Sequence, residues 1–389
     1  MPDRSIKRLT HEDIRADPTL IERLVNANES LFVERKQSVP REGIGPTIAS
    51  FANTLGGWLI LGVDNAGALV GFSPPGNADL ADWVRECLRN EVDPLPPFVA
   101  GTAIHEGHEV GLIKVAESTD TPHVTASGAV YVRVPAGKQP VTDHSALLEL
   151  ARRGREADAS ARERLTILPL IQGAFGAIGR LPGEKTHPPR PVAVEWIVRV
   201  APVSIPAGFA DRALSQATAR WAEEKCAGLV LSASHPWAPK VIPEPRARGI
   251  VVRAESQVAP EIADVVIDAG GVIAARKARR RNESVPELMH LPGLADDYFH
   301  PLLDLAAEGL SHLDANGRAV LSLEVRGVEK MAIWIQDGIQ GPLRGQDLHL
   351  GGELGIPADE ADLRSVSDAW MREIGRSAGI AMWEPPSAV

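Results

Sequence analysis

Cysteine is scarce in this chain, which has only Cys87 and Cys226 among its 389 residues. The two lie far apart and form no CxxC pair, which excludes a disulfide framework and a cysteine zinc site. Long apolar runs are also lacking, and the start, MPDRSIKRLTHEDI, has no apolar stretch typical of a secretory signal. We therefore expect a reduced, cytoplasmic protein without a membrane partner.

Positive charge is also not in excess. The formal net charge of −10 excludes the uniformly basic surface of a sequence-independent DNA binder, although it leaves room for a local basic groove. Aromatic residues make up only 4%, and the abundance of Ala, Arg and Pro is typical of a high-GC bacterial genome. The apolar share of 44% and the length are those of a globular protein with two domains.

The first part of the chain alternates strand and helix patterns. A helix is expected over 8–27 with a restart at Pro18, and a β-prone run over 31–36 follows it. From Ile44 to Leu55 apolar residues recur at helical spacing, and WLILGVD then has the continuous apolar pattern of a strand buried on both faces. Strand, helix and strand in this order predict a right-handed crossover between two parallel strands.

The remaining patterns predict two α+β domains. VAGTAIHEGHEVGLIKVAES reads as a hairpin, and DHSALLELARRG as a helix that closes the first domain. Later, PVAVEWIVRVAPV alternates like a strand, 207–226 reads as a helix, and RAVLSLEVRGVEKMAIWI as a hairpin. We predict a mixed sheet with a β-α-β crossover in a domain over 1–155, a helix and Pro/Gly-rich linker over 156–191, and an accessory α+β domain of unknown type over 192–389.

Two acidic residues end the predicted parallel strands. Glu34 and Asp64 lie near the carboxyl ends of neighbouring strands, which share one rim of a sheet, and Glu29 reaches that rim if the preceding turn folds back. Carboxylates that meet there repel unless a cation compensates them, and oxygen ligands favour Mg²⁺ or Mn²⁺. Such an ion can clamp a phosphodiester and activate water, with Lys36 at the phosphate. The alternative is a solvated strand edge with capping acids, and spacing alone does not choose between them.

Cations occur at two further places. Arg133 and Lys138 lie on and just after the YVRV strand, where they either contact a phosphate backbone or are only solvated. The cluster ARKARRR, 275–281, is the strongest basic run in the chain. It predicts either nucleic-acid contacts or a solvated helix face or loop. The nucleic-acid candidates in this run are Arg279, Arg280 and Arg281.

Several polar residues have simpler interpretations. Asn53 and Thr54 precede a glycine pair, a position that favours helix capping over phosphate binding. His123 is expected to make local hydrogen bonds in a loop, and Tyr131 to pack. HEGHE, 105–109, fits the tip of a hairpin and lacks the helical spacing of HExxH zinc sites.

Three segments together resemble the Schlafen-type AlbA domain: ESLFVERKQSV, TIASFANTLGGWLILGVDNAGALVGF and STDTPHVTASGAVYVRV. The resemblance runs over about residues 28–155 and does not extend to 180–389. In nuclease members of that family, two glutamates five apart and a later aspartate form a divalent-metal site, and these positions correspond to Glu29, Glu34 and Asp64. One departure is Arg35, where the family usually has an aromatic residue.

The resemblance implies a metal-dependent endoribonuclease that uses Mn²⁺ or Mg²⁺ and acts on structured, tRNA-like RNA. Two alternatives remain: a catalytically inactive regulator that binds RNA or DNA, and a nucleotide-sensing module. Some members of the family build a horseshoe from two such domains in one chain. A chain with one copy is therefore expected to form a homodimer.

Overall fold

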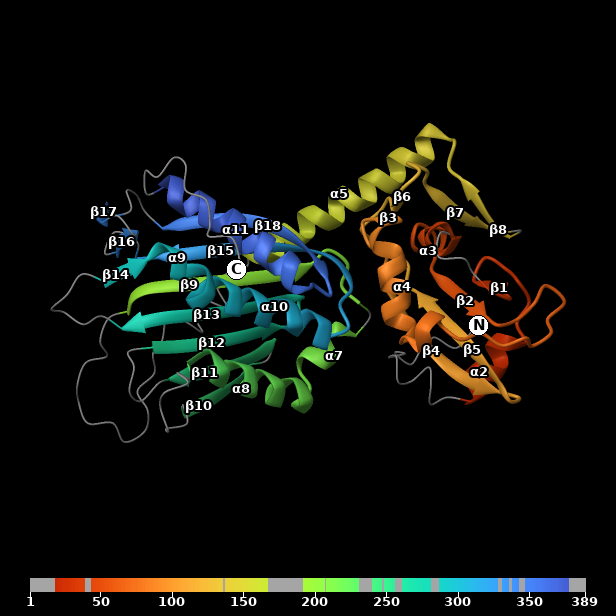
Figure 1. Ribbon diagram of the computed structural model, residues 1–389, viewed down its shortest axis with the longest axis horizontal. Helices are drawn as coiled ribbons and strands as arrows, with labels where there is room; N and C mark the ends of the chain where they lie inside the picture. The colour runs from red at the N-terminus through yellow and green to blue at the C-terminus, as the bar shows by residue number, and fades with distance from the viewer. Residues whose placement is uncertain are drawn as a thin grey trace. The chain divides into compact units, whose positions relative to one another are not determined.

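The computed structural model forms two compact α+β units, as the sequence predicted, and each is described by itself (Figure 1). The first consists of Met1–Ala159 with Asn316–Arg318, and the second of Ser160–Ala315 with Ala319–Val389. In the part of the chain that the structure describes, no helix is both long and apolar enough to cross a membrane. The described residues are 18–38, 43–135, 137–166, 192–206, 208–230, 240–246, 248–255, 261–280, 287–327, 331–335, 338–342 and 347–377.

The first unit is built on a sheet in the order β1-β2-β5-β4. Strands β1 (Val33–Lys36) and β2 (Gly57–Leu61) are parallel and are joined through helix α3 (Ile44–Ala52), so the predicted crossover is confirmed. Strands β4 (Phe98–His105) and β5 (His108–Val115) form the predicted hairpin. Since β1 is at the edge of this sheet, its side chains border solvent as well as the core.

The two faces of this sheet bury different helices. Leu59 and Leu61 of β2 pack with α3 and with α4 (Leu80–Arg89), whereas Trp58 and Ile60 pack with α2 (Pro18–Val25) on the other side. This division follows from the alternation of side chains along a strand. Helix α2 is described from Pro18, the residue at which the sequence predicted a restart, and the earlier part of the predicted helix, 8–17, lies outside the described residues.

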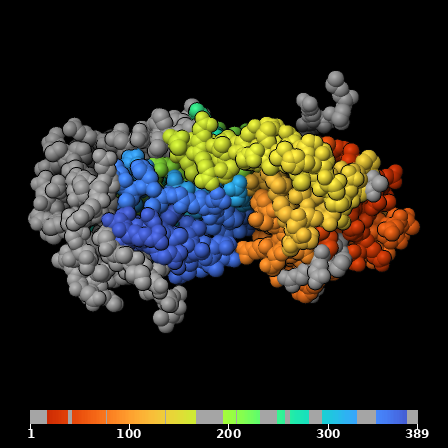
Figure 2. Space-filling model, turned by 90° about the horizontal axis from the view of Figure 1, so that it is seen from above, coloured from red at the N-terminus to blue at the C-terminus, as the bar shows by residue number. Residues whose placement is uncertain are grey.

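Short strand pairs and a long helix complete the first unit. Helix α3 packs against β7, which contains the YVRV motif. Helix α5 is longer than the predicted closing helix and lies within the yellow surface of Figure 2. The division between units falls within α5, and 167–191 is outside the described residues, so the predicted domain boundaries stay predictions. The remaining elements are η2 (Pro75–Asn77), β3 (Val92–Asp93), β6 (Val124–Thr125), β7 (Tyr131–Val134), β8 (Gly137–Pro140) and α5 (His144–Thr166).

The second unit has a seven-stranded sheet in the order β10-β11-β12-β13-β9-β15-β18. Helices α8, α10 and α11 pack on one face of it and bury an apolar core, seen in front of the strands in Figure 1. The strands are β9 (Val192–Pro202), β10 (Lys240–Arg246), β11 (Gly249–Glu255), β12 (Glu261–Asp268), β13 (Val272–Arg280), β15 (Gly317–Arg326) and β18 (Leu348–Ile356). The helices are α7 (Phe209–Ala213), α8 (Gln216–Val230), α9 (Leu291–Leu294), the π-turn η3 (Ala295–Phe299), α10 (His300–His312) and α11 (Glu360–Ser377).

Two expectations for the second unit are wrong. The segment RAVLSLEVRGVEKMAIWI is not a hairpin, because β15 pairs with β9 whereas β16 (Met331–Ile335) lies between β14 (Glu287–His290) and β17 (Gly338–Pro342) in a separate sheet. The helix expected over 207–226 is interrupted between α7 and α8. There the Ser215 hydroxyl accepts a hydrogen bond from the Thr218 amide and starts a new helix.

The face of the large sheet opposite the helices carries a buried row of charges. Asp264 accepts hydrogen bonds from Arg253 and Arg276, and Arg276 also donates to Glu195 at 2.7 Å. Asp264 and Arg276 are fully buried. Most of ARKARRR therefore belongs to a central strand rather than to a helix face or loop, and Arg276 is used to neutralise carboxylates inside the unit.

Candidate nucleic-acid interface

The centre of the candidate site is the carboxylate of Glu34. Glu34 and Lys36 lie opposite Leu59 and Leu61 of β2, so both face the side of the sheet that α3 covers. Glu34 is only 7% exposed. Its Oε1 lies 2.8 Å from the Lys36 ammonium, and its Oε2 accepts a hydrogen bond from the guanidinium of Arg133. Both carboxylate oxygens are therefore paired with cations.

Arg133 and Lys138 come to this centre from β7 and β8. Arg133 is 5% exposed, donates to the Ser30 carbonyl at 2.9 Å, and lies 4.4 Å from the centre of the Phe51 ring. Such a position over an aromatic ring favours a cation. The half-buried Lys138 donates to the Thr47 hydroxyl of α3 at 3.1 Å. The structure thus brings three of the predicted residues, Lys36, Arg133 and Lys138, around Glu34.

The Asn-Thr pair after α3 holds Arg133 in place. The buried Asn53 amide nitrogen donates to the carbonyls of His123 and Tyr131, and its oxygen accepts from the His123 amide at 2.8 Å. The Thr54 hydroxyl donates to an α3 carbonyl, as predicted for a cap, and also accepts the Arg133 amide at 2.9 Å. The sequence predicted only the capping role, because these partners are about 70 to 79 residues away in the chain.

Replacing Asn53 by alanine is expected to lower the free energy of unfolding by about 2–3 kcal/mol, because it leaves buried backbone groups of two segments unpaired. Hydrogen exchange of β7 amides in the full chain measures this loss. The control is Ser145→Ala, which removes hydrogen bonds at an exposed helix start. Equal protection of β7 in the Asn53 variant and the wild type would contradict this role.

The charges of the cluster alter two pKa values. Burial alone would raise the pKa of Glu34, yet the hydrogen bond from Lys36 and the charges of Lys36, Arg133 and Lys138 outweigh it and hold this pKa below its ordinary value. Burial lowers the pKa of Lys138, and repulsion from Lys36 and Arg133 lowers it further against the attraction of Glu34. A bound anion would relieve this repulsion, so the cluster is suited to one.

The predicted metal ligands are engaged elsewhere. Glu29 is exposed and accepts the Arg35 amide at 3.2 Å, while Oδ1 of Asp64 accepts the amides of Ala66 and Ala68 in its own turn. Within the described ranges, no three His, Cys, Asp or Glu side chains are placed to hold a metal ion. The residues as arranged do not fit a divalent ion, because the carboxylate of Glu34 already has two cationic partners. The Mn²⁺ or Mg²⁺ site stays a prediction from the resemblance.

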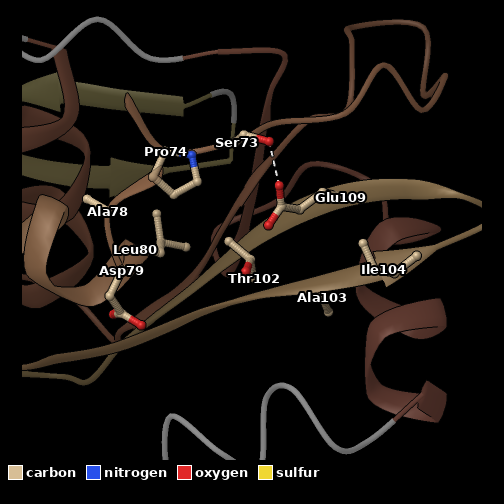
Figure 3. Close-up of a pocket in the computed structure, with 9 residues that line it drawn as sticks. All are labelled: Ser73, Pro74, Ala78, Asp79, Leu80, Thr102, Ala103, Ile104 and Glu109. Carbon is tan, nitrogen blue, oxygen red and sulfur yellow. Dashed lines mark hydrogen bonds between the residues drawn. The ribbon is translucent and has the colours of Figure 1, made fainter. Parts of the chain in front are cut away.

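The imidazole of His123 and the HEGHE segment lie outside the Glu34 cluster. His123 is fully buried, with Nδ1 2.6 Å from the Pro94 carbonyl, and burial lowers its pKa, which favours the neutral imidazole. HEGHE forms the tip of the β4–β5 hairpin, as predicted. Beside this hairpin lies a cavity of about 660 Å³, where the Ser73 hydroxyl donates to Glu109 (Figure 3). None of the predicted site residues lines it.

The basic run ARKARRR belongs to the second unit. Arg279 is half-buried on β13 and Arg280 ends that strand, while Arg281 lies outside the described residues. Their contact with nucleic acid stays a prediction.

Comparison with known proteins now gives the class of the first unit. Residues 29–142 match the family model described as Schlafen, AlbA_2. The amino-terminal unit is therefore a Schlafen-type AlbA domain, as the sequence predicted, and this indicates a nucleic-acid-related function.

A comparison with solved structures gives a match to a smaller part of a longer protein. The chain is similar to the solved DIP2311 protein from Corynebacterium diphtheriae, with 28% identity over 31% of this chain and a TM-score of 0.24. The match spans 20% of that protein's length. No match was found among curated proteins.

Proposed function

We propose that the amino-terminal domain binds nucleic acid through its phosphate backbone, with Lys36 and Lys138 as the contacting cations. The observation that carries this proposal is the convergence of three cations on one buried carboxylate. Three positive charges and one negative charge leave a local formal charge of +2, in a chain of net charge −10. A concentrated positive site of this kind favours phosphate.

The four side chains have different parts in this site. Arg133 is almost fully buried and is committed to Glu34 and the Ser30 carbonyl, so it positions the carboxylate. Lys36 keeps a third of its side chain exposed, and Lys138 is half-buried, so their ammonium groups have donors left for an anion. The cations repel one another, and the negative charge of Glu34 offsets this repulsion when no phosphate is bound. Glu34 therefore keeps the cations close together in the free protein.

Binding to fluorescent RNA and DNA strands of about 12 nucleotides tests the proposal, with EDTA present throughout. We expect saturable binding whose affinity falls as salt rises, with a slope of log affinity against log salt that counts the phosphate contacts. Absence of binding to every strand at low salt would overturn the proposal.

The finer hypothesis is cleavage: a metal-dependent endoribonuclease for tRNA-like RNA, with Glu29, Glu34 and Asp64 as ligands. It is supported by the family resemblance rather than by the arrangement of those carboxylates. Incubation of total tRNA with Mn²⁺ or EDTA tests it. Discrete metal-dependent fragments that the substitution Glu29→Gln, at an exposed candidate ligand, abolishes would establish cleavage, and intact RNA would favour the binding domain.

A further inference from the structure

The bend that leads into β1, the edge strand of the first unit, carries an exposed aromatic residue close in the chain to the cation cluster. Phe32 is 47% exposed, and its carbonyl accepts the Trp58 amide at 2.7 Å, which attaches this bend to β2. Strand β1 begins at the next residue, so Phe32 is two residues from Glu34 and four from Lys36 in the chain. Exposure of a large aromatic side chain to water is unfavourable in free energy, and a partner that stacks on the ring covers this apolar surface.

The backbone beneath Phe32 is fixed by the site itself. Arg133 donates to the Ser30 carbonyl, the Phe32 amide donates to the Ser30 hydroxyl at 3.2 Å, and the Ser30 amide donates to the Val33 carbonyl at 2.9 Å. Gly57 leaves no room for a side chain there, since an added Cβ would lie 2.7 Å from the Phe32 carbonyl. Phe32 is therefore presented on a rigid turn that is bonded to the same arginine that holds Glu34.

The Cα atoms of Phe32 and Lys36 are at most about 14 Å apart, because a fully extended chain advances about 3.3–3.6 Å per residue. A nucleic-acid strand that follows β1 can thus place a phosphate at Lys36 and an unpaired base at Phe32. Bases in a duplex are already stacked on their neighbours and do not offer a face to a side chain, whereas those of a single strand do.

We infer that the site takes single-stranded nucleic acid, with Phe32 as the platform on which one unpaired base stacks. This inference rests on the proposed function, because the phosphate contacts at Lys36 and Lys138 set the path of the strand. Stacking involves the base and not the sugar, so an RNA strand and a DNA strand can both place a base on Phe32.

Phe32→Ala, Phe32→Trp and the control Leu148→Ala test the inference in the full chain. Leu148 is 51% exposed on α5 in the same unit, so its truncation removes a comparable exposed apolar side chain. Anisotropy titrations use a mixed-sequence single strand of about 12 nucleotides and the corresponding duplex, each as RNA and as DNA. We expect Phe32→Ala to weaken single-strand binding by about 5- to 100-fold with an unchanged salt slope, and duplex binding by less than about twofold.

Phe32→Trp is expected to retain single-strand affinity, and the fluorescence of the new indole to be quenched when the strand binds. If wild-type protein binds and Phe32→Ala binds single strands equally well, the inference is overturned while the proposed function stands. Equal weakening for single strand and duplex would also overturn it. If the wild-type protein binds no strand, the proposed function itself fails.

Discussion

Replacing Lys36 and Lys138 together by glutamine is expected to lower the affinity of the full chain for nucleic acid by about 100-fold at low salt. Each ammonium supplies a charge-assisted hydrogen bond to phosphate, and such a bond contributes about 1.5–3 kcal/mol, so each loss weakens binding at least about tenfold. The slope of log affinity against log salt is expected to fall by about 2, because two phosphate contacts are lost. Anisotropy titrations at several salt concentrations measure both quantities.

The control for that variant is the double change Lys114→Gln and Arg152→Gln. Lys114 lies over Trp58, and Arg152 is already paired with Glu149 and Glu156. The control therefore removes the same charge from the same unit at places away from Glu34, and its affinity is expected to stay close to the wild-type value. If both double variants weaken binding equally, net charge rather than this cluster accounts for binding.

Glu34→Gln is expected to destabilise the first unit by about 3–5 kcal/mol, because it leaves the buried guanidinium of Arg133 without its counter-charge. Hydrogen exchange of β2 amides in the full chain measures this loss in the first unit separately from the second. Glu149→Gln, on the exposed surface of α5, is the matched control and is expected to leave the protection of β2 unchanged.

The same variant has a predicted pH dependence. The pKa of Glu34 is lowered in the folded unit. The ionised carboxylate therefore stabilises the fold at pH values above 4.5, the ordinary pKa of a glutamate. That contribution is lost as pH falls below 4.5 and through the lower pKa of the folded state. The stability difference between wild type and Glu34→Gln should therefore be constant near neutral pH and shrink in acid. A difference that grows in acid, or protection of β2 that the substitution does not change, would contradict the structural role of Glu34.

Much of the first unit could be predicted from local patterns. The apolar spacing from Ile44 onwards and the buried run of β2 define helix and strand without help from distant contacts, and together they fix the parallel crossover. The sequence also brought Lys36 near Glu34, since both lie on one short strand. It did not reveal that Arg133 pairs with Glu34, because the two are 99 residues apart and β7 is held by hydrogen bonds to Asn53 and Thr54, which are also distant in the chain.

The second unit was harder to predict from the sequence, again because its decisive partners are distant in the chain. The basic run on β13 has no local sign that distinguishes a solvated surface from a buried strand, and the difference is made by Asp264 and Glu195 on neighbouring strands. The false hairpin had the same origin: β15 and β16 are close in sequence, yet their partners are β9 and β14. Phe32 was missed as a candidate because its exposure depends on the position of β1 at the sheet edge.

We propose that the Glu34 centre binds phosphate through its cations and needs no metal ion to do so. The most direct test is the affinity of the wild-type chain for one RNA strand, titrated in EDTA and again in Mn²⁺ at equal ionic strength. We predict the same affinity in both, since Lys36 and Lys138 make the contacts without an ion. Binding that requires Mn²⁺ and disappears in EDTA would contradict the account and return Glu29, Glu34 and Asp64 to the role of metal ligands.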